Sequence, residues 1–149
     1  MTFTPAQLDA LEAPKRRKRV RVGSAKDDTG ASERAIQRAI IAALRLHRIK
    51  ALHVPNGSHL AGDAAARMRQ MAALRADGMV AGWPDLLIWK RVPGWPPLVG
   101  LLEIKRPGGV LSGDQLTVQA ALLHDGWPYR AVCSVDEALE AVRGWGWIV

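Results

Sequence analysis

Two carboxylates and a lysine lie at the ends of apolar segments in the middle of the chain. Asp85 directly precedes one apolar run, and Glu103 and Lys105 end the next one. Because side chains alternate between the faces of a strand, Glu103 and Lys105 should share one face and Ile104 should point to the other. Charged groups are unfavourable at such places unless they are paired or bind an ion. The pattern therefore favours a site for a cation.

A divalent metal ion would account for these charges. Hard ions such as Mg²⁺ take oxygen ligands, so Asp85, Glu103 and the main-chain carbonyl of Ile104 could form part of a coordination shell that waters and a phosphate oxygen complete. Such an ion activates water and polarises a phosphate, while Lys105 can orient the attacking hydroxide and offset charge on the phosphate. Taken singly, Asp85 would be an ordinary turn carboxylate, and Lys105 with Arg106 a solvated strand end.

Helices and strands that could position these residues alternate along the chain from Ser32 onward. Apolar residues at three- and four-residue steps predict helices, and short apolar runs bounded by turn residues predict strands. A Pro-Gly segment between the two central strands predicts a hairpin. The fold class is therefore α/β without an internal repeat. Helices are expected over residues 33–47, 64–76, 112–124 and 135–143, and strands over 51–55, 85–89, 98–105 and 129–133.

Composition bounds the class of protein and its partners. The chain has 149 residues, of which 48% are hydrophobic, which is enough for one compact domain. Its formal net charge of +7 indicates an anionic partner, either nucleic acid or a membrane surface. The membrane alternative is weak because no apolar run approaches the roughly 20 residues that span a bilayer. Cys133 is the only cysteine, and no signal peptide is evident, so a reducing, cytoplasmic setting is expected.

The first 31 residues are predicted to form a basic flexible arm. They contain a cluster of lysines and arginines that includes Lys18 and Arg19, followed by a stretch rich in Gly, Ser and Asp. The arm could contact phosphates or could simply be a solubilising tail. The remainder is basic without it, since residues 32–149 hold 14 Lys and Arg against 10 Asp and Glu.

The central residues resemble the signature of the PD-(D/E)XK nuclease superfamily, here Pro84-Asp85 and Glu103-Ile104-Lys105. Their surroundings resemble the VRR-NUC family within that superfamily, through Ser32-Glu33, the GWPDLL segment at 82–87 and the LLEIKRPGGVLSGDQ segment at 101–115. The resemblance covers about residues 32–140. The Trp-Pro pair before Asp85 departs from the smaller residues of many relatives, which puts the shape of this loop in doubt but not the ligand.

This resemblance implies a mixed central β-sheet flanked by helices, with the nuclease domain over residues 32–149. It also implies DNA cleavage that depends on Mg²⁺ or Mn²⁺. Carried over by position, Glu33 matches an acidic residue of the first helix, Asp85 and Glu103 the metal-binding carboxylates, Lys105 the catalytic lysine, and Gln115 a glutamine of the following helix. Stand-alone members are similar to Holliday-junction resolvases, which act as homodimers.

Several of these residues have ordinary structural alternatives. Glu33 could be an exposed residue of a first helical turn, although its spacing with Ile40 places it along the inward stripe. Gln115 could form a capping box with Ser112, a role compatible with one in the site. Arginines on the helix over residues 64–76 could be a solvated face or could contact phosphate. The candidate nucleic-acid-binding residues are Arg67, Arg69, Arg106, Lys18 and Arg19.

The sequence thus predicts a homodimeric, metal-dependent endonuclease that cuts branched or junction DNA. The alternative is a non-catalytic DNA-binding module on a nuclease-like scaffold, which the intact set of charged residues disfavours.

Overall fold

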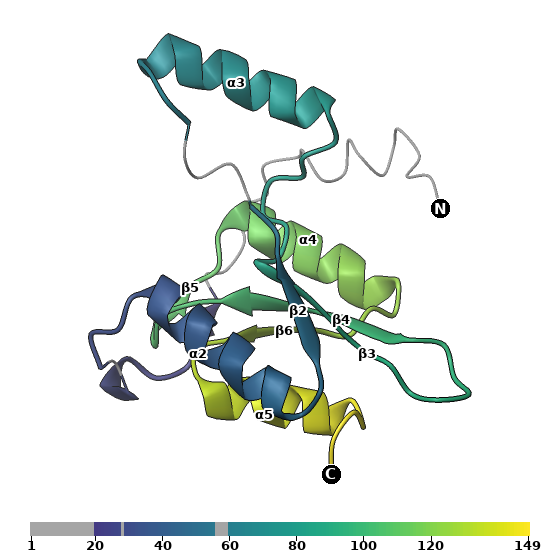
Figure 1. Cartoon of the computed structure of the whole chain (residues 1–149). Coiled ribbons are helices and arrows are strands. Elements are labelled where there is room, and N and C mark those ends of the chain that lie inside the picture. The colour runs from purple at the N-terminus through teal and green to yellow at the C-terminus, as the bar shows by residue number, and fades with distance from the viewer. Residues whose placement is uncertain (1–19, 28, 56–59) are drawn as a thin grey trace.

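The computed structural model describes residues 20–27, 29–55 and 60–149. All eight helices and strands predicted from the sequence are confirmed, in the predicted order (Figure 1). The helices are α2 (Glu33–Leu46), α3 (Ala64–Ala76), α4 (Gly113–His124) and α5 (Val135–Gly144), with a short 3-10 turn η1 (Ala25–Asp27). The strands are β1 (Arg21–Val22), β2 (Lys50–His53), β3 (Leu86–Lys90), β4 (Leu98–Ile104), β5 (Gly109–Val110) and β6 (Tyr129–Val132).

The central sheet is mixed, with the strand order β2-β3-β4-β6. β3 and β4 form the predicted antiparallel hairpin, in which Leu86 lies opposite Leu102. β6 pairs with β4 in parallel, because the chain returns through α4 before it re-enters the sheet. The α/β class with a mixed sheet is therefore confirmed.

One face of this sheet is closed by α2 and α5, which lie side by side beneath it in Figure 1. Ser32 caps α2, since its hydroxyl accepts a hydrogen bond from the Ala35 amide at 3.2 Å. The inward stripe of α2 contributes Ile36, Ile40 and Leu44. These side chains pack against apolar residues of the sheet and of α5, which include Leu86, Ile88, Leu102, Ile104, Val132 and Val142.

The opposite face is covered only in part, by α4 (Figure 1). Leu101 and Tyr129 of the sheet pack there against Val118 and Leu122 of α4. Toward the edge strand the cover ends, and Leu52 of β2 is 55% exposed. Glu103 projects on this α4 side of β4, because it alternates with Leu102 and Ile104 of the closed face.

Helix α3 stands apart from the other elements in Figure 1. Asp63 caps it, accepting a hydrogen bond from the Ala66 amide at 2.7 Å. None of its residues is buried, and Met68 is 74% exposed. Its formation was predicted correctly, but it adds nothing to the core. Across the described ranges, no helix is both long enough and apolar enough to cross a membrane.

The described end of the predicted N-terminal arm pairs with a strand of the domain. Arg21 and Val22 form β1, which pairs antiparallel with β5. Val22 is buried in a small cluster with Leu111 and Cys133. The burial of Val22 and the pairing of β1 with β5 stabilise the position of this segment. Lys18 and Arg19 lie outside the described residues.

Candidate active site

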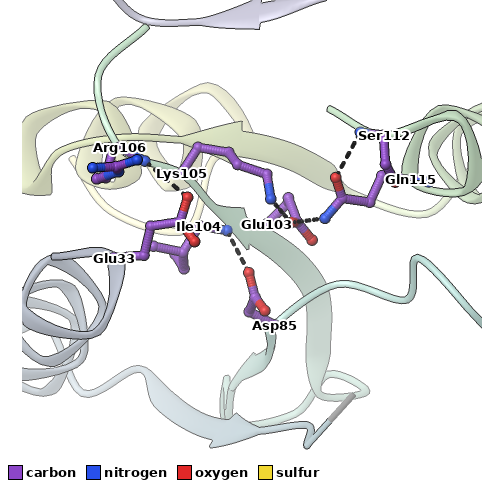
Figure 2. Close-up of polar contacts among 8 residues, drawn as sticks. All are labelled: Glu33, Asp85, Glu103, Ile104, Lys105, Arg106, Ser112 and Gln115. Carbon is purple, nitrogen blue, oxygen red and sulfur yellow. Dashed lines mark hydrogen bonds and ion pairs between the residues drawn. The ribbon is translucent and has the colours of Figure 1, made fainter. Parts of the chain in front are cut away.

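The β3–β4 hairpin brings Asp85 to the end of β4. The register that places Leu86 opposite Leu102 puts Asp85 beside Glu103, although the two are distant in sequence. The Asp85 carboxylate accepts a hydrogen bond at Oδ2 from the Ile104 amide at 2.8 Å. Figure 2 shows this bond close to the Glu103 side chain. The predicted meeting of Asp85, Glu103 and Lys105 is therefore found in the structure.

Glu103 is the only buried charged residue among the described residues, with 1% of its surface exposed. Its Oε1 lies 3.0 Å from Lys105 Nζ in an ion pair. The Gln115 side-chain amide also donates a hydrogen bond to Oε1. The second oxygen, Oε2, is buried and has no hydrogen-bond partner. Because an unpaired buried carboxylate oxygen is costly, this atom requires a further partner.

The pKa values of both carboxylates are raised. Burial raises the pKa of Glu103 to about 7, and the nearby Asp85 adds to this shift while Lys105 opposes it. Burial also raises the pKa of Asp85, against the lowering effects of the Ile104 amide and Lys105. One lysine therefore does not compensate the negative charge of the site, and a cation would stabilise both ionised carboxylates.

The donor atoms fit a hard divalent metal ion. Within the described ranges, no group of three or more His, Cys, Asp and Glu side chains is arranged to hold a metal. The donors that remain are Asp85, Glu103 with its unpartnered Oε2, and the Ile104 carbonyl. An extended residue directs its N–H and C=O to the same side, and the Ile104 N–H points to Asp85. One or two carboxylates with waters and phosphate is the typical environment of Mg²⁺, and it does not suit a structural zinc site.

Glu33 is the first residue of α2 and lies next to the site. Its carboxylate accepts a hydrogen bond at Oε1 from the Arg106 main-chain amide at 3.3 Å (Figure 2). Its charge raises the pKa of both Asp85 and Glu103. Glu33 is nevertheless exposed, so the inward position predicted from its helical spacing is only partly correct. It borders the two carboxylates without being buried with them.

Gln115 has both of the roles that the sequence left open. Its Oε1 accepts from the Ser112 amide at 2.8 Å, and the Ser112 hydroxyl accepts from the Gln115 amide at 3.2 Å, which completes the capping box of α4. Its Nε2 donates to Glu103 at the same time. The first turn of α4 thus fixes one oxygen of Glu103.

The loop before Asp85 is packed tightly against α4. Gly82 has a φ of 78°, and a Cβ added there would lie 2.5 Å from main-chain atoms of Asp114 and Gln115. Pro84 is fully buried, and Trp83 packs against the cluster beneath α4. The unusual Trp-Pro pair therefore anchors the loop, and Asp85 keeps its place.

Two residues near the site were not among those predicted. His53, at the end of β2, has its Nδ1 3.2 Å from the Asp85 main-chain oxygen. Tyr129, at the start of β6, is 6% exposed, and its hydroxyl is buried without a hydrogen-bond partner. A polar residue at the end of a strand next to the hairpin was the available signal in both cases. That pattern is too common to assign Tyr129 a role, and in the sequence it favours an ordinary loop residue near the DNA for His53 over a metal ligand.

The predicted nucleic-acid-binding residues lie in two places. Arg106 is exposed directly beside the site. Arg67 and Arg69 are exposed on α3, where the Arg67 guanidinium donates to the Gly62 carbonyl at 2.9 Å. The structure does not bring these two groups into contact.

The comparison with protein families gives one match. The model of the VRR-NUC domain matches residues 31–137, a range that contains Glu33 and the whole Asp85 to Gln115 site. No curated protein and no solved structure matches the chain. The match spans most of the sequence and agrees with the α/β fold, so the chain has a nuclease-type role in DNA processing. The chain belongs to the VRR-NUC domain family, a family of nuclease domains in the PD-(D/E)XK superfamily.

Proposed function

We propose that the protein is a divalent-metal-dependent DNA endonuclease that hydrolyses phosphodiester bonds. The observation that carries the proposal is Glu103, which is buried with one oxygen held by Lys105 and the other unpartnered, beside a second carboxylate with a raised pKa. A structural ion pair would not need the second carboxylate. An arrangement for binding Mg²⁺ or Mn²⁺ at Asp85, Glu103 and the Ile104 carbonyl needs both.

The residues of the site would divide the work. A bound divalent ion would supply Lewis acidity toward the scissile phosphate. Lys105, half-buried and paired with Glu103, would orient the attacking water and offset negative charge on the phosphate. Gln115 holds the Glu103 carboxylate, and the Ile104 amide holds that of Asp85. Glu33 would act at the border of the site, where it is exposed to water and substrate.

Basic residues on two surfaces support DNA as the substrate. Arg106 adjoins the site, and we propose that it binds the phosphate next to the scissile bond. Arg67 and Arg69 on the isolated helix α3 would contact DNA farther away. Phosphate contacts of this kind position DNA but carry no sequence information. Lys18 and Arg19 would add to these contacts.

We further propose that the enzyme prefers branched or junction DNA and acts as a homodimer. The similarity of stand-alone VRR-NUC members to junction resolvases supports this preference. Two cuts in a branched substrate require two sites, and one chain supplies one. The exposed Met68 of α3 is an apolar group available to a second copy.

The test is a cleavage assay on labelled junction, flap and duplex DNA with Mg²⁺ or Mn²⁺. Asp85→Ala, Glu103→Ala and Lys105→Ala should each lower the cleavage rate by at least about a hundredfold while salt-sensitive DNA binding persists. Glu140→Ala is the control, because Glu140 is an exposed residue of α5 on the far side of the sheet. Wild-type rates in the Asp85 and Lys105 variants would reject the assignment. DNA binding without cleavage by the wild type would instead favour a non-catalytic binding module.

A further inference from the structure

The buried face beneath α4 contains two polar atoms that lack hydrogen-bond partners. In the described part of the chain these are the only such side-chain atoms, namely Glu103 Oε2 and the Tyr129 hydroxyl. One is an acceptor when ionised, and the other is a donor. Leaving either group unsatisfied costs about 1 to 3 kcal/mol. The hydroxyl lacks an acceptor and the carboxylate oxygen lacks a donor, so each group could supply what the other needs.

The strand pairing places these groups on the same face of the sheet. β4 and β6 run in parallel, with Leu101 opposite Tyr129 and Glu103 opposite Ala131. Directly paired residues point to the same side, so the Tyr129 ring packs beside Leu101 beneath α4 and lies on the same face as Glu103. The charges of Glu103 and Asp85 reach the phenol and, together with burial, raise the pKa of Tyr129. Tyr129 is therefore near the two carboxylates and remains a neutral donor.

We infer that the Tyr129 hydroxyl donates a hydrogen bond, through one bridging water, to Glu103 Oε2, and so positions Glu103 for metal binding. One water would give the hydroxyl an acceptor and would occupy one lone pair of Oε2, which leaves the other lone pair for the metal. Carboxylate ligands of metals are commonly oriented by hydrogen bonds from surrounding residues. Lys105 and Gln115 fix Oε1, and Tyr129 would fix the other oxygen. Tyr129 is thus a positioning residue, and this role rests on the proposed metal-dependent function.

The contact can be tested without metal or DNA, because Tyr129 is the only tyrosine of the chain. A ¹³C label at the Cζ atom of tyrosine gives a single NMR signal. Glu103→Met removes the acceptor and should shift this signal clearly, whereas Glu140→Met, on α5, should leave it in place. An unshifted signal in Glu103→Met would overturn the inference whether or not the protein cleaves DNA. A failure of Glu103→Met to fold is covered by Glu103→Gln, which should also shift the signal.

The positioning role is tested by Tyr129→Phe, which removes only the hydroxyl and keeps the ring packed under α4. Calorimetric titration of the protein with Mn²⁺ alone should show an affinity about tenfold weaker than in the wild type. Without metal the variant should fold as the wild type does, because the ring keeps its packing against Val118 and Leu122. Wild-type Mn²⁺ affinity in Tyr129→Phe would overturn the role. Absence of Mn²⁺ binding by the wild type would contradict the proposed function as well, while the NMR comparison still decides the contact.

Discussion

The two faces of the central sheet bury their side chains under different constraints. On the face covered by α2 and α5, Leu102 and Ile104 are buried in a continuous apolar core. Between them on the same strand, Glu103 is equally buried on the face that α4 covers in part. One step along β4 thus separates a side chain that needs only packing from one that needs charged and polar partners. A charged site can therefore be built into a stable sheet if one face alone forms the main core.

A charge introduced on the closed face should lower the free energy of unfolding more than any other change proposed for this sheet. Leu102→Asp places a carboxylate where no polar partner is near, and should lower the free energy of unfolding by about 4 kcal/mol or more. Leu52→Asp makes the same change on the face that α4 covers in part, and should cost about 1 kcal/mol because Leu52 is 55% exposed. Urea unfolding followed by circular dichroism measures both. Equal losses would contradict the distinction between the faces.

The pH dependence of stability should show the cost of Glu103 on the α4 side. Its pKa is about 7 in the folded chain against an ordinary value of 4.5, so its stabilising effect is present below pH 4.5 and is lost as the pH rises through 7. Without metal, the wild type should lose up to about 3 kcal/mol between pH 5 and pH 8 relative to Glu103→Gln. Urea unfolding of both proteins across this range is the measurement. Parallel curves would show that Glu103 is not the group responsible.

A side chain that disrupts the contact of Gly82 with α4 should lower the free energy of unfolding by less than the charge changes above. The loss should still exceed the cost of backbone strain alone. Gly82→Ala puts a methyl group against the main chain of Asp114 and Gln115, and should cost about 2 kcal/mol. Gly94→Ala is the matched control, since Gly94 has a similar φ of 79° but no atoms within 4 Å of an added Cβ. It should cost about 1 kcal/mol. Thermal unfolding compares them, and equal losses would mean that the loop does not depend on this contact.

The smallest expected effect is stabilisation by the proposed metal. Mg²⁺ at five times its Kd should raise the free energy of unfolding by about 1 kcal/mol at pH 8, and EDTA should reverse the change. The gain should shrink at pH 6, because protons compete for the Glu103 carboxylate. Asp85→Asn should remove the gain without changing the fold. A gain that persists in this variant would place the metal elsewhere.

Most of the fold was predictable because its signals are local. Ser32 as a cap, the apolar spacing of α2 and the Pro-Gly turn between β3 and β4 each depend on neighbouring residues. β1 was not predicted, because two residues carry no periodicity and their partner, β5, lies far along the chain. The isolation of α3 was also hidden, since helical propensity says nothing about what a helix packs against.

The meeting of Asp85, Glu103 and Lys105 was predictable from strand alternation together with the hairpin. The burial of Glu103 to 1% and its unpartnered oxygen were not, because both depend on how α4 packs over the strand. Tyr129 escaped notice for the same reason: it is an unremarkable strand residue until the parallel pairing of β6 with β4 places it beside Leu101.

The double role of Gln115 has a practical consequence for watching the site in solution. Its oxygen closes the first turn of α4, and its nitrogen contacts the carboxylate of Glu103. A nitrogen-15 spectrum would therefore report, from one side-chain NH₂ group, both the fraying of that helix end and any change in the occupancy of the neighbouring oxygen. The protein carries its own reporter group, so titrations could be followed without attaching a dye.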